Sequence, residues 1–255
     1  MEVTDMEQNG FFNKTALVTG GYTGIGKAIA QSFATAGTDV ILTGRNREKG
    51  SAVAEELKEK YKVRAEFYFC DLCSPDSVES TVRNIKKDFA RIDVLVNNAG
   101  IYPAAPFLEM EDKDFSHIFD VNVMGVFRMT RAVVNHFMKD QRSGKILSIS
   151  SVDSWKPTAG ITAYAASKAA LNSLVKSFAI ELAEYGITSN GIAPGWVATE
   201  PVLKAGRWKT QISQVLKGRM ADPSEIGELA VFLCSDKADY LNGEVVNFSG
   251  GLLMN

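Results

Sequence analysis

The stretch that decides the fold is Thr15–Lys27, which reads TALVTGGYTGIGK. It begins as a short apolar strand pattern, passes through a glycine-rich turn, and continues into a helical pattern near Gly26. Glycine allows tight turning and lacks the Cβ that would hold a phosphate away from the backbone. The N-terminus of the following helix offers free N–H groups to an anion. The stretch therefore predicts a phosphate-binding turn between a first strand and a first helix.

Three interpretations of this turn stay open. The run from Gly21 to Lys27 resembles the phosphate-binding loop of nucleoside triphosphatases, but Ala28 stands where that loop needs Ser or Thr to hold magnesium. A methyl group cannot ligate a metal ion, so this interpretation is disfavoured. The second is a purely structural glycine turn. The third, which we favour, is a dinucleotide site whose spacing differs from the usual Gly-x-Gly-x-x-Gly form, with glycines at Gly20, Gly24 and Gly26.

Strand and helix patterns alternate along the rest of the chain. Strands are expected at Thr15–Thr19, Val40–Thr43, Glu66–Phe69, Val94–Val96, Lys145–Ser148, Thr188–Ile192 and Glu244–Phe248. Helices are expected near Gly26–Ala36, Arg47–Tyr61, Pro75–Ala90, Asp112–Lys139, Ala163–Glu184 and Pro223–Cys234. Several strands are apolar without alternation, which is typical of a parallel sheet covered by helices on both faces. A doubly wound α/β fold is predicted, with an N-terminal extension at residues 1–11 and a single domain at residues 12–255.

Composition excludes several classes of protein. The 255 residues are 45% hydrophobic, and 28 Lys and Arg against 30 Asp and Glu leave a formal net charge of −2. This balance indicates a folded globular protein and disfavours a nucleic-acid-binding one, which usually needs a basic excess. The sequence has no apolar run as long as a membrane span, and the first ten residues contain no basic residue, so neither a membrane segment nor a secretory signal is expected. Three cysteines are few and odd in number for a secreted disulfide scaffold, which predicts a cytoplasmic location.

A phenol and an ammonium group share one face of the helix expected at Ala163–Glu184. Tyr164 and Lys168 are four residues apart near its start. A free Tyr titrates near about pH 10, and a nearby cation favours the phenolate, so Lys168 is expected to lower the pKa of Tyr164. The alternative is an ordinary Tyr that packs over a Lys stem.

Other polar residues follow the expected strands, at the edge where such sheets bind ligands. Ser150 and Ser151 come after the strand at Lys145–Ser148, and the run NNAG at residues 97–100 follows the strand at Val94–Val96. Taken singly, each is explained as a turn former. Asn122 stands between apolar neighbours within an expected helix, where a buried amide needs partners. Their conjunction with Tyr164 and Lys168 predicts a catalytic site.

In order and spacing these segments closely resemble the short-chain dehydrogenase/reductase family over about residues 12–251. The resemblance rests on six elements, namely Thr19–Gly26, Asn97–Gly100, Asn122, Ser151, Tyr164-x-x-x-Lys168 and Pro194-Gly195-x-x-x-Thr199. It implies a Rossmann-type sheet of seven parallel strands and a nicotinamide dinucleotide. It also implies hydride transfer between the nicotinamide and a carbonyl or alcohol carbon.

The resemblance also assigns roles to residues. Tyr164 is implied to be the general acid in ketone reduction and the base in the reverse reaction, assisted by Lys168. Ser151 is implied to hold the substrate oxygen, with Ser150 less favoured, and Asn122 to distort its helix and anchor a water that passes protons to Lys168. Two hydroxyl donors on one oxygen would stabilise the charge that develops there. The implied cofactor contacts, besides Tyr164 and Lys168, are Gly20, Tyr22, Thr23, Gly24, Ile25, Gly26, Asp71, Leu72, Asn98, Ala99, Gly100, Pro194, Gly195, Val197 and Thr199.

The end of the second expected strand bears on cofactor choice. An acid there would bind the ribose 2′-hydroxyl and repel a 2′-phosphate. Gly44 stands at that position, and Arg45 beside it is suited to a bidentate, charge-assisted contact with phosphate. NADP(H) is therefore predicted over NAD(H), with a merely solvated Arg45 as the alternative. Many NADP-dependent members carry a second basic residue in the glycine loop, where this chain has Tyr22 and Thr23.

Cys70 and Cys73 form a C-x-x-C pair, a pattern also typical of thiol redox or zinc sites. The sequence contains no second pair, and its two histidines, His117 and His136, lie far along the chain. Neither redox nor metal chemistry is expected here.

The substrate is the feature that the sequence defines least. Tyr102, Trp155, Trp196 and Leu203 lie in segments that bind substrate in the family, so a partly apolar pocket is expected. Pro201–Ala221 contains five basic residues and no acid, which indicates either a solvated face or a surface for an acidic or carrier-bound substrate. A ketoreductase for 3-oxoacyl thioesters or a biosynthetic ketone is favoured; a sugar or polyol dehydrogenase and a non-catalytic dinucleotide sensor are the alternatives. Family members usually form homotetramers, sometimes dimers, so a homotetramer is expected.

Overall fold

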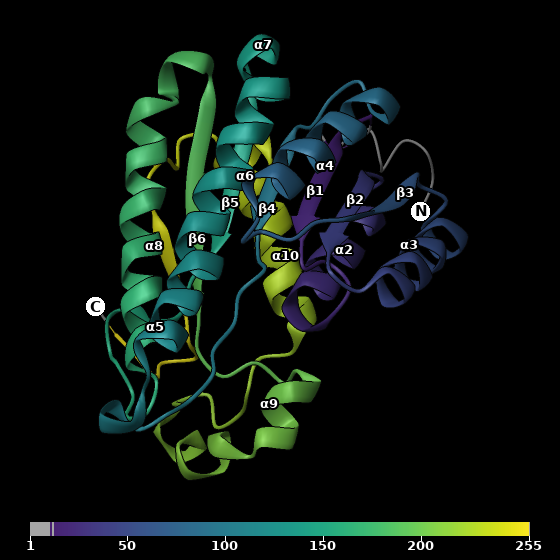
Figure 1. The fold of residues 1–255 in the computed structure, drawn as a ribbon. Helices are drawn as coiled ribbons and strands as arrows, with labels where there is room; N and C mark the ends of the chain where they lie inside the picture. Colours follow the sequence, from purple (N-terminus) through teal and green to yellow (C-terminus); the bar gives the residue numbers. More distant parts are fainter. Residues whose placement is uncertain (1–10, 12, 255) are drawn as a thin grey trace.

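A sheet of seven parallel strands runs through the centre of the computed structural model, which describes residue 11 and residues 13–254 (Figure 1). The strands lie in the order β3-β2-β1-β4-β5-β6-β7. Their bounds are β1 (Thr15–Thr19), β2 (Asp39–Gly44), β3 (Ala65–Phe69), β4 (Val94–Asn97), β5 (Gly144–Ile149), β6 (Ile187–Pro194) and β7 (Val245–Phe248). The prediction of a doubly wound, Rossmann-type α/β fold with seven parallel strands is confirmed.

Helices connect the strands along the chain. Their bounds are α2 (Gly24–Thr35), α3 (Arg47–Tyr61), α4 (Pro75–Asp88), α5 (Asp112–Phe119), α6 (Gly125–Val133), α7 (Lys139–Gln141), α8 (Thr162–Glu181), α9 (Glu200–Ala205) and α10 (Pro223–Cys234). The single helix expected at Asp112–Lys139 is one helical path from α5 to α7, interrupted by π-helical turns at Asp120–Met124 and Val134–Met138.

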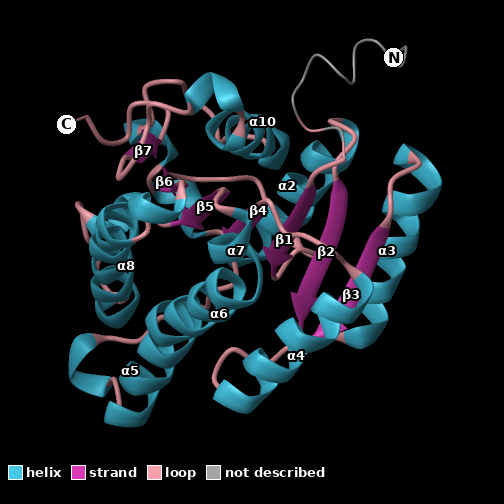
Figure 2. Cartoon of the chain, turned by 90° about the horizontal axis from the view of Figure 1, so that it is seen from above, coloured by secondary structure: helices cyan, strands magenta, loops and turns pink. Residues whose placement is uncertain are grey.

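Two apolar layers attach the helices to the two faces of the sheet (Figure 2). One layer joins α2, α3 and α10 to the sheet and includes Phe33, Leu57 and Ile226. The other joins α4 and α6 and includes Ile85 and Met129, and α8 lies on this same side. Both faces of the sheet are therefore covered.

Neighbouring residues of the central strands enter opposite layers. In β1, Val18 belongs to the layer with α2 and Leu17 to the layer with α4; in β4, Val96 and Leu95 divide in the same way. All four are fully buried. This division explains the apolar runs without alternation, because a strand covered on both faces has no solvent side for polar residues.

The order of the strands reverses at β1. From β1 the chain proceeds to β2 and β3 on one side of the sheet. It then returns to β4 on the other side of β1 and continues outward through β5, β6 and β7. Such a switch point opens a crevice beyond the carboxyl ends of the strands. The polar segments after β1, β4 and β5 therefore meet at one edge of the sheet.

The structure describes the N-terminal extension predicted at residues 1–11 only at Phe11. This residue is buried against Phe33, with ring centroids 5.6 Å apart. The rest of that extension, residues 1–10, lies outside the described residues.

The basic segment Pro201–Ala221 contains most of α9 and short 3₁₀ turns at Arg207–Thr210 and Ile212–Gln214. Among the residues that the structure describes, we find no helix that is both long enough and apolar enough to cross a membrane.

Candidate active site

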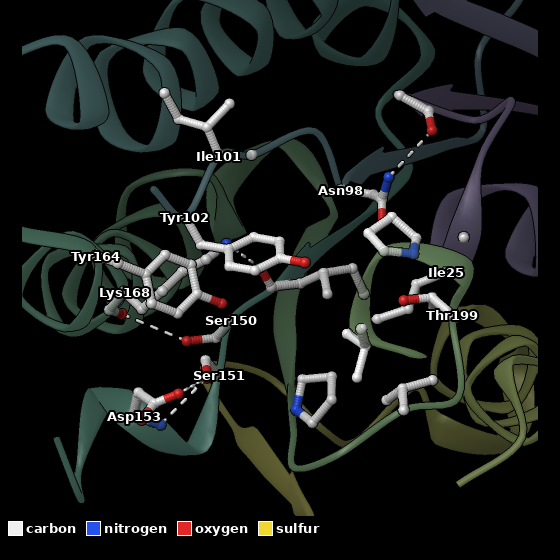
Figure 3. Close-up of a pocket in the computed structure, with 18 of the residues that line it drawn as sticks. Ile25, Asn98, Ile101, Tyr102, Ser150, Ser151, Asp153, Tyr164, Lys168 and Thr199 are labelled. Atoms are coloured by element: carbon white, nitrogen blue, oxygen red, sulfur yellow. Dashed lines mark hydrogen bonds between the residues drawn. The ribbon is translucent and has the colours of Figure 1, made fainter. Parts of the chain in front are cut away.

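A cavity of about 720 Å³ lies beyond the carboxyl ends of the central strands (Figure 3). Its wall brings together the glycine loop after β1, the loops after β4 and β5, the start of α8 and the segment after β6. Most of the predicted site residues line it, namely Gly20, Tyr22, Thr23, Gly24, Ile25, Arg45, Asp71, Leu72, Asn98, Ala99, Gly100, Tyr102, Ser151, Tyr164, Lys168, Pro194, Gly195, Trp196, Val197 and Thr199. Four predicted residues lie outside the wall: Gly26, Asn122, Trp155 and Leu203.

The glycine loop has a backbone conformation that side chains disfavour. Gly20 and Gly24 have φ angles of +64° and +51°, in the left-handed region. Thr23, the N-cap of α2, makes no side-chain cap hydrogen bond, whereas Asn46 and Ser74 cap α3 and α4. The first N–H groups of α2 are thus left for a ligand at the cavity wall. This cradle fits a pyrophosphate, whose oxygens would take the place of a capping side chain.

Gly26 has a packing role, which corrects the expectation that it lines the pyrophosphate. It is buried behind the loop. A Cβ at this position would lie 2.5 Å from the carbonyl oxygen of Gly20 and would also collide with the side-chain amide of Asn98. Gly26 therefore lets α2 approach the ends of β1 and β4 closely, the role of the third glycine in dinucleotide-binding turns.

Hydrogen bonds hold the turn after β4 to the end of β1. The Thr19 hydroxyl accepts from the backbone N–H groups of Asn98 and Ala99, each at 3.0 Å. The side-chain amide of Asn98 donates to the Thr19 carbonyl oxygen at 2.9 Å. These bonds fix the spacing of the two strands on either side of the crevice.

The end of β2 shows why an acid is missing from position 44. A Cβ on Gly44 would lie 2.9 Å from the Tyr22 hydroxyl oxygen and would overlap the Tyr22 ring. That ring is held edge-on against Phe67, with centroids 5.9 Å apart and an interplanar angle of 81°. Tyr22 therefore occupies the space that an acid on β2 would need. Arg45 follows, exposed and in the cavity wall.

The two serines after β5 differ in their surroundings. The Ser150 hydroxyl donates to Asn172 Oδ1 of α8 at 2.5 Å and is buried. The Ser151 hydroxyl lies 3.1 Å from Asp153 Oδ2 and also accepts from the Asp153 backbone N–H at 3.1 Å. Figure 3 shows Ser151 beside Asp153 at the wall of the cavity. Ser150 thus serves the contact with α8, and Ser151 is the hydroxyl presented near Tyr164.

Tyr164 lies in the first turn of α8, with its ring centroid 5.9 Å from that of Tyr102. Burial raises the pKa of Tyr164 above its usual value, and the Asp153 carboxylate and Tyr102 add to the increase, whereas the Ser151 hydroxyl opposes it. Lys168, which was expected to lower this pKa, is not among the groups that shift it here. Lys168 Nζ lies 5.8 Å from the centre of the Tyr164 ring and donates to the Ile149 carbonyl oxygen at 2.7 Å.

Lys168 is an almost completely buried ammonium group. Burial lowers its pKa to about 8. Its neighbour across the crevice is Gly100, where a Cβ would lie 3.5 Å from Lys168 Nζ. Lys168 is therefore a desolvated donor in the cavity wall, suited to hydroxyl groups of a ligand.

Asn122 lies in the π-helical turn between α5 and α6, so the predicted distortion of its helix is present. Its side chain exchanges two hydrogen bonds of 2.9 Å with the Ile101 backbone. Its amide also donates to Ser167 Oγ of α8 at 3.0 Å. Asn122 thus ties the loop after β4 to α8 from behind the cavity wall.

The substrate side of the cavity agrees only partly with the predictions. Tyr102 and Trp196 line the wall, but Trp155 and Leu203 are 40% and 47% exposed and do not. Of the five basic residues of Pro201–Ala221, Arg207 alone lines this cavity. Others are paired with acids, as Lys204 is with Glu200 and Arg219 with Glu225.

Several polar residues of the wall were not predicted. Asp153, Lys156 and Thr158 come from the loop after β5, and Gln211 and Gln214 from the segment after α9. One of these residues, Asp153, has a signal in the sequence. It stands two residues after Ser151, and a Ser hydroxyl that precedes a helical turn often accepts from the backbone N–H two residues on. The structure has such a 3₁₀ turn at Val152–Ser154.

The C-x-x-C pair has the properties of structural thiols. Cys70 is buried and Cys73 is partly buried, and both are free. Burial raises the pKa of each thiol to about 11, which disfavours the reactive thiolate. Within the described part of the chain, no group of three His, Cys, Asp or Glu residues is placed to hold a metal ion.

Comparison with known proteins decides the family. The family model described as short chain dehydrogenase matches residues 14–210. The chain belongs to this family. It is accordingly an oxidoreductase that acts on CH–OH or carbonyl groups with a nicotinamide cofactor.

Relatives of this short-chain dehydrogenase cover nearly its whole length. It is 39% identical to the 3-oxoacyl-(acyl-carrier-protein) reductase of Aquifex aeolicus, over 94% of this chain and 97% of that protein. It is 37% identical to the enzyme of the same name from Vibrio harveyi, over 94% and 98%. Among solved structures, L-sorbose reductase from Gluconobacter frateurii, complexed with NADPH and L-sorbose, is 31% identical with a TM-score of 0.91, covering 96% of this chain and 98% of that one.

Proposed function

We propose that this protein reduces a ketone to a secondary alcohol with NADPH. The observation that carries the proposal is the meeting of Ser151, Tyr164 and Lys168 in the same cavity as the glycine loop. The glycine loop would hold the nicotinamide dinucleotide, which would supply a hydride for the carbonyl carbon or accept one from the alcohol. The protein has to orient the ketone, donate a proton to its oxygen and exclude water.

Tyr164 is the group that holds the transferred proton, at its Oη. The Tyr164 phenol carries its proton at neutral pH even at the ordinary Tyr pKa of about 10, as a general acid must before transfer. Burial raises this pKa further, so transfer to the ketone depends on the positive charge of the nearby Lys168 to bring it back toward neutrality. When a ketone binds, the Ser151 hydroxyl would turn from Asp153 Oδ2 and donate to the same substrate oxygen, so two hydroxyls would stabilise the negative charge as it forms. Alcohol oxidation needs the phenolate, and it becomes faster as the pH rises.

Lys168 and Asn122 support this pair in different ways. Lys168 would donate to the hydroxyls of the nicotinamide ribose from its buried position beside Gly100. Asn122 is a positioning residue, because it binds the Ile101 backbone and Ser167 and so holds the loop after β4 against the helix that carries Tyr164. A water held near Asn122 would pass protons to Lys168.

The preference for NADP(H) over NAD(H) rests on the end of β2. Tyr22 fills the space that an acid at position 44 would need, so the repulsion that excludes a 2′-phosphate is removed. Arg45 lines the cavity within reach of this space and offers a planar guanidinium to phosphate oxygens.

Two substrate classes are supported to different degrees. The 3-oxoacyl-(acyl-carrier-protein) reductases named above favour a 3-oxoacyl thioester or another biosynthetic ketone. The L-sorbose reductase favours a sugar or polyol. A non-catalytic dinucleotide sensor is disfavoured, since a sensor needs none of the proton-handling groups present here.

We also propose that the protein forms a homotetramer. Large apolar side chains are exposed at Phe115 on α5, Met124 in the π-helical turn and Ile180 on α8, with exposed fractions of 39%, 42% and 79%. Exposed apolar surface on these helices would be covered in an assembly. Light scattering on the purified protein would measure the assembly state, and a monomer would contradict it.

The decisive test measures NADPH oxidation with a panel of ketones for the wild type and for Tyr164→Phe. Loss of the general acid is expected to lower kcat by about 10²- to 10⁴-fold, because Phe keeps the ring but lacks the hydroxyl that donates the proton. NADPH binding, followed by fluorescence, should stay within about twofold. Equal turnover in the two proteins would contradict the assignment of Tyr164.

A further inference from the structure

The loop after β5 places in the cavity wall a carboxylate that the proposed reaction does not use. Asp153 Oδ2 lies 3.1 Å from Ser151 Oγ, the hydroxyl that holds the reacting oxygen. Asp153 Oδ1 accepts from the Thr158 hydroxyl at 2.8 Å. Figure 3 shows Asp153 next to Ser151, close to the phenol of Tyr164. The carboxylate is therefore an immediate neighbour of the reaction centre.

Asp153 retains acceptor capacity toward a ligand. An ionised carboxylate has about four lone-pair positions and no donor. Thr158 takes one of these, and Ser151 takes a second only while its hydroxyl is not turned to a ketone oxygen. The side chain is only partly buried and lines the cavity, so the remaining positions are open to a bound molecule. A ligand that presents another acceptor there would be repelled, whereas a donor would be bound.

We infer that Asp153 selects substrates that carry a hydroxyl group on the carbon next to the reacting carbonyl, which makes the substrate an α-hydroxy ketone and the product a vicinal diol. This inference rests on the proposed function, since Ser151 must hold the reacting oxygen. The oxygens of Ser151 and Asp153 are direct neighbours, so the ligand oxygens that they bind are neighbours too. Oxygens on adjacent carbons have that arrangement.

The charges around the cavity favour a hydroxyl as the donor. An ammonium group on the substrate would also suit Asp153 alone, but Lys156 and Arg207 line the same cavity and would repel it. A 3-oxoacyl thioester presents a methylene group and then a second carbonyl, so it offers Asp153 no donor. In the inferred reaction a hydride reaches the carbonyl carbon and a proton its oxygen. The reduced nicotinamide is oxidised, and the neighbouring hydroxyl is unchanged.

Paired substrates test the inference directly. The full-length protein is assayed with NADPH on 3-hydroxy-2-butanone and 2-butanone, which differ in one hydroxyl, and on acetoacetyl-N-acetylcysteamine as the thioester. A hydrogen bond to a charged group predicts that kcat/KM for the hydroxy ketone exceeds that for 2-butanone by about 10- to 100-fold. In Asp153→Ala this ratio should fall to within about threefold of one, and in Asp153→Asn, which keeps one acceptor, to an intermediate value.

Ser154→Ala is the matched control. Ser154 lies in the same turn and donates to the Ser151 carbonyl oxygen at 2.6 Å, but it does not line the cavity. If Asp153 served only to position Ser151, the Asp153 and Ser154 variants would slow both ketones equally and leave the ratio intact, which would overturn the inference. A wild-type ratio near one, or a thioester preferred over the hydroxy ketone, would also overturn it. If the wild type reduced no ketone at all with either nicotinamide cofactor, the proposed function itself would fail.

Discussion

The two ends of the cavity are built by different rules. At the cofactor end, backbone and side chains pack so closely that a Cβ at Gly26 or Gly44 would overlap its neighbours. At the substrate end, α9 and the turns up to Gln214 contain no buried residue. The first region can change little without loss of structure, whereas side chains of the second can vary more. For this reason the residues themselves reveal the cofactor but hardly the substrate.

The largest expected effect is the change with pH in the free energy of unfolding that Lys168 of the cavity wall causes. Its pKa is lowered by burial from 10.5 to about 8. Between these values the unfolded chain binds more protons than the folded one, so the stability of the wild type rises with pH across this window. Relative to Lys168→Met, the free energy of unfolding of the wild type should therefore gain about 2 to 3 kcal/mol from pH 7 to pH 10.

Urea unfolding of both proteins at several pH values measures this difference, and groups common to both cancel. If the free energies of unfolding of the two proteins changed in parallel with pH, Lys168 would be better solvated than its burial indicates. The part of the cavity wall around Lys168 would then be open to water.

The next prediction contrasts the packing of the two ends. Gly26→Val should lower the free energy of unfolding by about 1 to 3 kcal/mol, because the added side chain is forced against Asn98 and the Gly20 carbonyl. Leu203→Ala, in the exposed α9, should change it by less than about 0.5 kcal/mol. Thermal and denaturant unfolding give both values. Similar losses in the two variants would remove the distinction between a rigid cofactor end and a tolerant substrate end.

The most localised predicted effect is confined to one phosphate. Arg45→Ala should raise the KM for NADPH about 10- to 100-fold, since a charge-assisted contact is lost, and should leave the KM for NADH nearly unchanged. Arg47→Ala is the matched control, because Arg47 stacks on Phe69 at 4.7 Å and does not line the cavity. A wild-type KM for NADH equal to or below that for NADPH would contradict the role of Arg45.

Local patterns sufficed for the sheet and for the parts of the site that belong to strand ends. Val18, Leu17 and their counterparts in β4 are apolar because both faces of the sheet are covered, and a run of that kind is visible in any stretch of a few residues. Tyr164 and Lys168 lie one helical turn apart, so their common face is a consequence of helix geometry alone.

Features that depend on distant contacts were not predictable in the same way. Gly26 was expected at the ligand but packs against Asn98, which is far away in sequence. Tyr22 excludes a side chain at position 44 only because Phe67 of β3 supports its ring. Burial and the Asp153 carboxylate raise the pKa of Tyr164, and both effects come from residues outside its own helical turn.

By itself the sequence determined the strand and helix order, the glycine turn and the candidate proton-handling residues, since each is encoded within one turn or one strand. The tertiary structure alone decided which side chains face the cavity: Asp153 and Arg207 inward, Trp155 and Leu203 outward. The physical reason is that loop direction is set by packing between segments far apart in the chain. Substrate recognition in this fold depends on those directions.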